Sequence, residues 1–355
     1  MKSIAFLSLF LFACSQTPEA GQGQDLDVKI DSGRADQSSP KSDLGRDDVR
    51  RADLDPTADL GTDLEDKPDL SSQDMSSNDM SEDATSEDVQ PVEPKSGSFS
   101  VLIYNVAGLP ALLSDADPAT NIPIISPLLN AYDLVLVQED FWYHNELKAG
   151  VTLPYASTPQ DANPSVRNLH DGLNRFSRFQ LAMLSRVKWT DCSGFSITGN
   201  NDCFARKGFS VGEVELEEGI SILVYNLHMD AGRSRGDINA RKKQSLQLGA
   251  DIQSRATGRA IIVAGDTNMY FRRPDDVTNL AAFLTQTGLQ DSCDALACMD
   301  NRVDRIFYRS SSDVNLLVSA RHLPTEFVNP AGEDLSDHKP VSIDLDWEQI
   351  LPQPF

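Results

Sequence analysis

Residues 15–97 contain no Phe, Trp or Tyr, and this absence most constrains what the chain can fold into. The same 83 residues carry 22 acidic and 8 basic side chains, which gives the segment a net charge of −14. Such a segment cannot bury enough apolar surface to offset the entropy lost on ordering, so we expect it to stay disordered. Residues 98–355 are therefore the part of the chain that we expect to fold.

The net charge of the chain is consequently divided between two different segments. The whole chain has a net charge of −23, and −10 of it remains for residues 98–355 once Lys2 is counted. A charge of this sign argues against a protein that coats nucleic acid by electrostatic attraction. Apolar residues make up 40% of the sequence, enough for a sizeable core. No stretch reaches the roughly 18 apolar residues that a membrane helix needs.

The first 14 residues have the pattern of an export signal. Met1-Lys2-Ser3 precedes a short apolar run over residues 4–12, and a small residue comes before Cys14. Leu11-Phe12-Ala13-Cys14 resembles the lipobox of bacterial lipoproteins, although Phe12 stands where that motif usually has a small residue. The resemblance implies that residues 1–13 are removed and that Cys14 is lipidated. An ordinary signal peptide that happens to contain a Cys is the alternative.

Residues 14–97 would then tether an exported domain to the bacterial cell envelope, at the outer membrane or the cell surface. A flexible chain of this length spans roughly 50 Å, and charge repulsion extends it further. Calcium binding by the acidic residues is a weaker alternative, because the spacing of a calcium-binding loop is absent.

Four further cysteines form two pairs that are close in sequence. Cys192 lies near Cys203, and Cys293 lies near Cys298, each pair in a polar segment. In an oxidising compartment such pairs are expected to form two local disulfides. A metal site is less favoured, because the pairs lack both Cys-x-x-Cys spacing and a nearby His.

Apolar segments alternate with helix-compatible ones between residues 98 and 355. The expected strands cover residues 98–105, 134–138, 209–217, 220–227, 260–264, 303–308 and 341–345. The expected helices lie near 122–132 and over 236–256. Glu218-Gly219 joins two of the strands as a hairpin turn. Mixed strands and helices in one domain indicate an α/β or α+β sandwich rather than a pure β domain.

Polar residues stand at the ends of several of these strands. The segments are Asn105, Gln138-Glu139-Asp140, Asn226-Leu227-His228, Gly265-Asp266-Thr267-Asn268, Val303-Asp304-Arg305 and Ser336-Asp337-His338. Apolar strands that deliver such residues to one rim build a single polar site. Each segment alone also has a local structural explanation, such as a turn, so the inference depends on their combination and order.

That combination resembles the endonuclease/exonuclease/phosphatase superfamily, which includes deoxyribonuclease I and the neutral and bacterial sphingomyelinases. The resemblance covers residues 98–347, nearly the whole expected domain. It implies a two-sheet α/β sandwich flanked by helices, like deoxyribonuclease I. It also implies hydrolysis of phosphate esters with a divalent cation, usually Mg²⁺, with Mn²⁺ or Ca²⁺ as alternatives.

The resemblance assigns the metal side of the site to three residues. Glu139 corresponds to the main metal carboxylate, with Asn105 beside it, and Asp337 to a further carboxylate that usually acts through water. Magnesium prefers oxygen ligands and keeps several waters, so one or two carboxylates and an amide suit it.

The resemblance assigns the proton-handling side to five further residues. His338 corresponds to the histidine that partners the attacking water and the phosphate, oriented by Asp304. Asp266 would handle the nucleophile, while Asn268 would donate to a phosphoryl oxygen. His228 would stabilise the pentavalent phosphorus or protonate the leaving oxygen. A His held by a carboxylate has a fixed tautomer and can move a proton near neutral pH.

Other polar residues are open to two interpretations. His170 could contact the metal or phosphate, or it could be a loop residue. Lys207-Gly208-Phe209 follows Asp202-Cys203 in a way that resembles secreted sphingomyelinase-like proteins. Arg233 and Arg235 could meet an anionic substrate or be solvated loop charges.

The substrate is expected to be a phosphodiester, either a lipid headgroup or nucleic acid. The tether and the 192–207 region favour a sphingomyelinase-like lipid phosphodiesterase acting as a monomer at a membrane. Val303-Asp304-Arg305-Ile306 resembles a stretch of deoxyribonuclease I, so a secreted nuclease is the alternative. A catalytically silent surface-binding lipoprotein is a third possibility. Four acidic residues of the site belong to the −10 of the domain, which weakens the exclusion of nucleic acid and strengthens the case for a metal.

Overall fold

The computed structural model describes residues 93–110, 117–161, 169–194, 202–298 and 301–352. The proposed lipidation site Cys14, the export signal and the tether up to residue 92 lie outside the described residues. None of the helices in the described part is long and apolar enough to cross a membrane.

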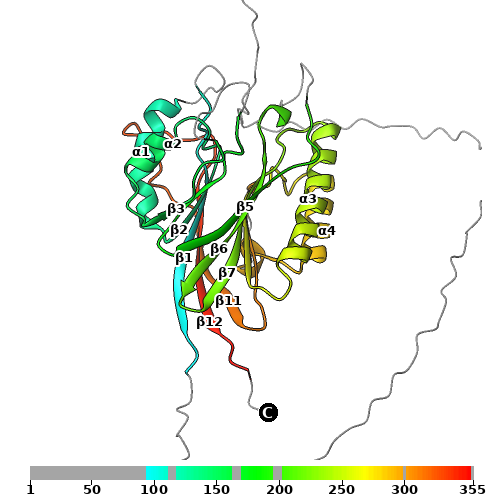
Figure 1. The fold of residues 1–355 in the computed structure, drawn as a ribbon. Helices are drawn as coiled ribbons and strands as arrows, with labels where there is room; N and C mark the ends of the chain where they lie inside the picture. Colours follow the sequence, from blue (N-terminus) through cyan, green and yellow to red (C-terminus); the bar gives the residue numbers. More distant parts are fainter. Residues whose placement is uncertain (1–92, 111–116, 162–168, 195–201, 299–300, 353–355) are drawn as a thin grey trace, which may run out of the picture. The chain divides into compact units, whose positions relative to one another are not determined.

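Two mixed sheets of six strands each form the centre of the domain (Figure 1). The first sheet has the strand order β11-β12-β1-β2-β4-β3, and the second has the order β5-β6-β7-β8-β10-β9. In the first sheet the strands are β1 (Ser96–Asn105), β2 (Leu134–Gln138), β3 (Tyr155–Ala156), β4 (Asn174–Ser177), β11 (Val314–His322) and β12 (Val341–Gln349). In the second they are β5 (Gln180–Lys188), β6 (Gly208–Glu217), β7 (Ile220–His228), β8 (Ile261–Asp266), β9 (Gln290–Asp291) and β10 (Asp304–Arg309).

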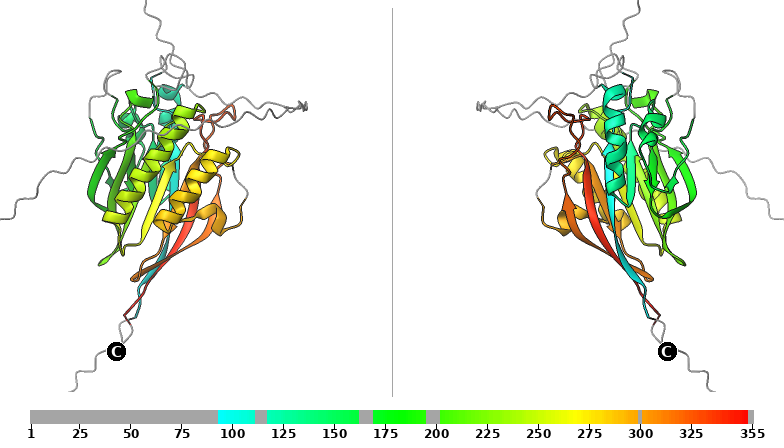
Figure 2. Two further views of the ribbon diagram at one scale, coloured as in Figure 1. Left: turned by 90° about the vertical axis from the view of Figure 1, so that its right-hand side faces the viewer. Right: turned by 90° about the vertical axis from the view of Figure 1, so that its left-hand side faces the viewer.

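Helices cover the outer face of each sheet (Figure 2). They are α1 (Pro118–Leu128), α2 (His144–Ala149), α3 (Arg235–Arg255), α4 (Pro274–Thr287) and α5 (Ser292–Ala295), with the short 3₁₀ turns η1 (Leu129–Ala131) and η2 (Asp202–Phe204). The helices α1 and α2 lie on the first sheet, and α3 and α4 lie on the second (Figure 1). The domain therefore has four layers, in the order helix, sheet, sheet, helix.

Three apolar clusters hold these layers together. The largest lies between the sheets and includes Ile103 of β1 and Ile262 of β8, both fully buried. A second packs Leu248 of α3 and Phe283 of α4 on the second sheet, and a third packs Ile122 of α1 on the first sheet. Both sheets bury residues on both faces, which explains why β2 and β8 read as continuous apolar runs.

The strand register shows that the N- and C-terminal limits of the domain lie at one end of the sandwich. The polar residues at the strand ends lie at the other. β1 pairs with β12 from Ser96 opposite Glu348, next to the N- and C-terminal limits of the described domain. The other end of β1 places Asn105 opposite Gln138 of the parallel strand β2. In the second sheet, His228 lies opposite Asp266, and Asp266 lies opposite Asp304. The register thus gathers the predicted site residues at one end of the sandwich.

The α/β sandwich predicted from the sequence is confirmed, as are the two disulfides. Cys192 is bonded to Cys203 and Cys293 to Cys298, with Cα–Cα distances of 5.4 and 5.0 Å. Every predicted strand is present, although β1 begins at Ser96, two residues earlier than expected. The sequence reasoning did not identify β3, β4, β5, β9 and β11, nor helices α2, α4 and α5.

Candidate active site

Asp266, the last residue of β8, is the centre of the polar cluster. Its side chain is 1% exposed. Its Oδ2 lies 3.3 Å from His228 Nε2 and 3.8 Å from His338 Nε2, and it accepts a hydrogen bond from Asn105 Nδ2 at 3.4 Å. Its Oδ1 accepts from the backbone N–H of Asn268 at 2.9 Å. Burial, partly offset by the charge of His338, raises the pKa of this carboxyl.

The backbone around Asp266 allows β7 and β8 to lie unusually close. Gly265 has φ +137°, and a Cβ at this position would lie 2.1 Å from the carbonyl oxygen of Leu227. Only glycine fits there, because it lacks the Cβ that would collide with the neighbouring strand. Asn268 follows with φ +51° and turns its Nδ2 toward Asp266 Oδ2 at 3.2 Å and the Met229 carbonyl at 3.1 Å. The backbone conformation of residues 265–268 therefore fixes where the side chains of Asp266 and Asn268 lie.

His338 is held by Asp304, the residue that the family resemblance assigns to orient it. His338 Nδ1 lies 2.9 and 3.1 Å from the two carboxylate oxygens of Asp304, the first residue of β10. Burial disfavours protonation, but the charges of Asp304 and Asp266 outweigh it and raise the pKa of His338 well above its usual value. Ser336 anchors this loop by donating to the Asn105 carbonyl at 2.7 Å and accepting from the His338 backbone N–H at 3.1 Å. His338 is therefore a protonated imidazole in a fixed orientation.

His228 is the second histidine of the site and has the opposite protonation state. It is 1% exposed, and its Nε2 also lies 3.8 Å from Glu139 Oε1. Burial, followed by the positive charges of Lys207 and His338, lowers its pKa well below the usual value. His228 is consequently neutral near pH 7. With Nε2 facing carboxylate oxygens, this is the nitrogen that carries its proton.

Glu139 stands directly after β2 in a left-handed backbone conformation with φ +57°. Asn105 Nδ2 donates to its Oε1 at 3.2 Å. Burial and the charge of Asp337 raise the pKa of the Glu139 carboxyl to about 7. Asp337 itself is exposed, in the same loop as His338. The site thus concentrates carboxylates that destabilise one another's charge, and a cation would relieve this repulsion.

The donor set fits a hard divalent cation, with one adjustment. Glu139 and Asp337 provide carboxylate oxygens, the ligands that Mg²⁺ prefers. Asn105 presents its NH₂ group to Glu139, while its Oδ1 accepts from the Ala107 N–H at 3.1 Å, so its amide would have to turn to become a ligand. Ligand atoms of Asp266, Asp304 and His338 also lie within 4.8 Å of one another. Because His338 Nδ1 is paired with both carboxylate oxygens of Asp304, Glu139 and Asp337 are the residues that would hold the cation.

Lys207 belongs to the site, although the sequence reasoning did not place it there. It is 8% exposed and stands immediately before β6, with its Nζ 2.5 Å from Asp202 Oδ1. Its charge lowers the pKa values of Glu139 and His228. Burial disfavours the ammonium form, but Asp202 and Glu139 outweigh it and raise the pKa of Lys207. The sequence did contain a signal for this role, because Lys207 stands just before a predicted strand and shortly after Cys203.

Gln138 and Asn226 join the two sheets beneath the site. Gln138 Nε2 donates to Asn226 Oδ1 at 2.7 Å, and Asn226 Nδ2 donates to the carbonyls of Val137 and Asn174 at 2.9 and 3.1 Å. Both side chains are fully buried. Asp140, after Glu139, binds His144 Nδ1 at 2.6 Å and fixes the loop that follows β2. These polar residues hold the site rather than line it.

The weaker candidates have structural or solvent-exposed roles. His170 is 2% exposed and bonds the Phe141 carbonyl through Nε2 at 2.8 Å, while its Nδ1 accepts from the Gly172 N–H at 3.1 Å. Both of its nitrogens are engaged with backbone, so His170 is a loop residue. Arg233 and Arg235 are exposed.

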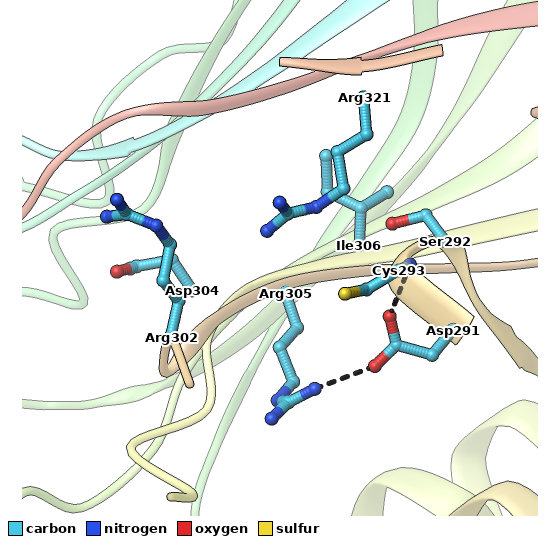
Figure 3. Close-up of a pocket in the computed structure, with 8 residues that line it drawn as sticks. All are labelled: Asp291, Ser292, Cys293, Arg302, Asp304, Arg305, Ile306 and Arg321. Carbon is cyan, nitrogen blue, oxygen red and sulfur yellow. Dashed lines mark hydrogen bonds and ion pairs between the residues drawn. The ribbon is translucent and has the colours of Figure 1, made fainter. Parts of the chain in front are cut away.

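A small cavity lies behind Asp304, lined by Arg302, Arg305 and Arg321 (Figure 3). Its volume is about 10 Å³, which leaves room for one water molecule at most. The cavity therefore lies beside the first residues of β10 and is too small to extend the candidate active site.

The chain is similar to known proteins in sequence and in fold. The model of the Endonuclease/Exonuclease/phosphatase family matches residues 102–338. Sphingomyelinases of Mycobacterium bovis and Mycobacterium tuberculosis are 35% identical over 274 residues, which cover 71% of this chain and 54% of theirs. The chain thus spans about half the length of these curated relatives.

Two solved structures illustrate the shared fold. A Staphylococcus aureus beta toxin mutant with bound magnesium ions is 15% identical, with a TM-score of 0.51, over 70% of this chain and 99% of its own. D. rerio TDP2 complexed with a single strand DNA product is 17% identical, with a TM-score of 0.54, over 70% of this chain and 98% of its own. At these identities the likeness concerns the fold alone.

Proposed function

The chain belongs to the endonuclease/exonuclease/phosphatase family, and we propose that it hydrolyses a phosphodiester with the help of a divalent cation. The observation that carries this proposal is the arrangement around Asp266. One buried carboxylate lies between a protonated His338 and a neutral His228, next to the carboxylate of Glu139. This arrangement offers an acceptor for the proton of water and two donors for phosphoryl oxygens.

Glu139 and Asp337 would hold the cation, with Asn105 as a third ligand after its amide turns. A divalent cation at this position supplies positive charge to phosphoryl oxygens and lowers the pKa of bound water. Magnesium is the proposed ion because the available donors are carboxylate and amide oxygens. Mn²⁺ and Ca²⁺ share this preference for oxygen ligands.

The protein's own groups would handle the proton and the developing charge. Asp266 orients the attacking water and accepts its proton, because burial raises the pKa of its carboxyl and makes the carboxylate a stronger base. The His338 imidazolium and the neutral His228 Nε2–H donate to phosphoryl oxygens, whose negative charge grows in the transition state. Asn268 Nδ2 donates to Asp266 Oδ2 and to the Met229 carbonyl, and it would donate to a phosphoryl oxygen by exchanging the first of these bonds.

We propose a lipid phosphodiester of the sphingomyelin type as the preferred substrate. The mycobacterial relatives named sphingomyelinases, at 35% identity over most of the folded domain, support this class. The net charge of −10 on residues 98–355 also disfavours a polyanionic substrate over a headgroup with a single phosphate. A nuclease of the deoxyribonuclease I type is the alternative that the test must include.

A substrate panel on the full chain tests both statements. Sphingomyelin, lysophospholipid, plasmid DNA, RNA and bis-p-nitrophenyl phosphate are incubated with Mg²⁺ or with chelator. Mg²⁺-dependent turnover is expected, with sphingomyelin preferred, and Glu139→Gln and His338→Ala should remove it. Preferential turnover of DNA would replace the lipid by the nuclease. The absence of turnover on every substrate would favour a silent binding protein.

Two matched variants control for non-specific damage. Glu218→Gln changes an exposed glutamate in the β6–β7 turn. His322→Ala removes an exposed histidine that pairs with Asp344 at 2.8 Å on the edge of the first sheet. Both should retain wild-type turnover, whereas equal losses in these variants and in the site variants would contradict the assignment.

We further propose that the protein is a monomer, exported and anchored to the cell envelope by lipid on Cys14. The lipobox-like sequence at residues 11–14 supports this location. Cys14→Ser should move the protein from the membrane fraction to the soluble fraction, and mass spectrometry should find lipid only on the wild type. An unmodified Cys14 in the membrane fraction would contradict the proposal.

A further inference from the structure

A cleft opens between α4 and the segment that follows Asn268. It lies beside the loop that begins at Asp266 and Asn268, which is called the catalytic loop below. Its volume is about 180 Å³. The walls are mainly apolar and include Met269, Phe271, Val277, Leu280, Ala281 and Leu284. The polar part of the lining consists of Tyr270, Asp276, Asp294 and Arg305. Phe271 and Val277 remain 38% and 39% exposed, so part of this apolar wall faces solvent.

Arg305 of β10 stands in the lining of this cleft and is 4% exposed. Its Nη1 donates to Asp291 Oδ2 at 2.8 Å, and the ring of Phe271 lies 4.2 Å from its Cζ. Nε and Nη2 have no hydrogen-bond partner among the described residues. Figure 3 shows one corner of the guanidinium pointing at Asp291 and the other nitrogens turned away from it.

Three carboxylates lie near Arg305, and two of them are engaged by other groups, whereas Asp294 lines the cleft and is exposed. Asp276 binds Arg241 at 3.0 Å and accepts from the Tyr270 N–H at 3.3 Å. The second oxygen of Asp291 accepts from the Cys293 N–H at 2.8 Å. The Nε–Nη2 edge of Arg305 is thus a buried pair of adjacent donors that these acids do not satisfy.

We propose that this cleft binds an anionic amphiphile, with its carboxylate or phosphate on Arg305 and its short apolar chain along α4. The Nε–Nη2 edge of a guanidinium matches the two oxygens of such a group, and buried donors are strongly favoured to be paired. The apolar wall supplies the surface that a hydrocarbon chain needs.

The position of the cleft links it to the catalytic loop. Met269 and Phe271 follow Asn268 within three residues, and the Tyr270 N–H fixes the loop to Asp276 at the start of α4. The amphiphile would therefore contact the same loop that positions Asn268 and Asp266. It could come from the medium as a free molecule or from a membrane as an anionic lipid.

Calorimetric titration of the full chain with octanoate tests the site. Saturable binding of about one octanoate per chain is expected, while octanol and acetate, which lack the anion or the chain, should bind at least about tenfold more weakly. Ala281→Trp fills the cleft from an exposed position on α4 and should weaken binding by at least about tenfold. Ala282→Trp, exposed on the same helix but outside the lining, should leave it unchanged.

Arg305→Lys provides an independent check, because lysine keeps a charge for Asp291 but lacks the paired donors. It should weaken octanoate binding by about tenfold without changing octanol binding. Equal binding by the Ala281→Trp and Ala282→Trp variants, equal binding of octanol and octanoate, or no saturable binding would overturn the proposal. Vesicles containing an anionic lipid identify the source: competition with octanoate indicates a membrane lipid, and octanoate binding without competition indicates a free amphiphile.

Discussion

Replacing Lys207 by Met should destabilise the fold and impair catalysis for two separable reasons. Lys207 and Asp202 are 8% and 6% exposed, and their charged atoms lie 2.5 Å apart. Removing one partner leaves Asp202 as a buried charge without its counter-ion, which costs about 3–5 kcal/mol in the free energy of unfolding. The ammonium group of Lys207 also lowers the pKa values of Glu139 and His228, and the substitution removes this effect.

The double variant Lys207→Met/Asp202→Asn separates these two effects. With both buried charges removed, the free energy of unfolding should return to within about 1–2 kcal/mol of the wild type. Turnover should stay low, because the ammonium beside Glu139 and His228 is still missing.

Guanidinium unfolding, followed by Trp fluorescence with the disulfides intact, measures the stability of the wild type, both single variants and the double variant. Hydrolysis of bis-p-nitrophenyl phosphate measures activity. Additive losses in stability, or a loss below about 1 kcal/mol for Lys207→Met, would refute the buried ion pair. Full recovery of turnover in the double variant would refute the electrostatic role and leave Lys207 a structural part of the loop.

Three further predictions follow from the site and its surroundings. Because burial and Asp337 raise the pKa of Glu139 from 4.5 to about 7, the folded metal-free protein retains a proton there that the unfolded chain has released. Its stability in chelator should therefore fall by up to about 3 kcal/mol as pH rises from 4.5 to 7, and Glu139→Gln should flatten this slope in urea titrations at each pH. Asp304→Asn should lower kcat by about 10²–10⁴, since it removes the charge that holds the His338 proton, and an unchanged kcat would contradict this role. Cys293→Ser/Cys298→Ser opens a loop with a separation of five residues and should cost about 2 kcal/mol of stability in urea unfolding, with kcat within about twofold of the wild type.

The strand ends of the site were predictable because each follows a continuous apolar run. β2 and β8 are buried on every residue, so the first polar side chain after them marks the point where the strand leaves the core. Glu139 is the first residue after β2, and Asp266 is the last residue of β8. Register then follows from topology, since parallel strands bring their carboxyl ends to the same edge.

The missed strands lack this signal for a physical reason. β5 is exposed or half-buried along its whole length and carries a bulge between Ala182 and Ser185 with Met183 at φ +52°, so neither alternation nor an apolar run is visible. β4 is only four residues long and buries Arg175, whose Nη1 donates to the Val224 carbonyl of the opposite sheet at 3.1 Å. A charged residue inside a short strand resembles a loop until its partner from the other sheet is known.

Local sequence also could not reveal why fully buried polar residues occur between the sheets. Asn105 belongs to the first sheet and Asp266 to the second, yet their side chains lie 3.4 Å apart. The distances in the site therefore depend on how the two sheets are spaced, and apolar packing alone resists sliding only weakly because it is not directional. The directional bonds of Gln138 to Asn226 and of Arg175 to Ser210 tie the sheets at fixed points below the site. Polar residues in this core thus hold together the two halves of a candidate active site that neither sheet contains alone.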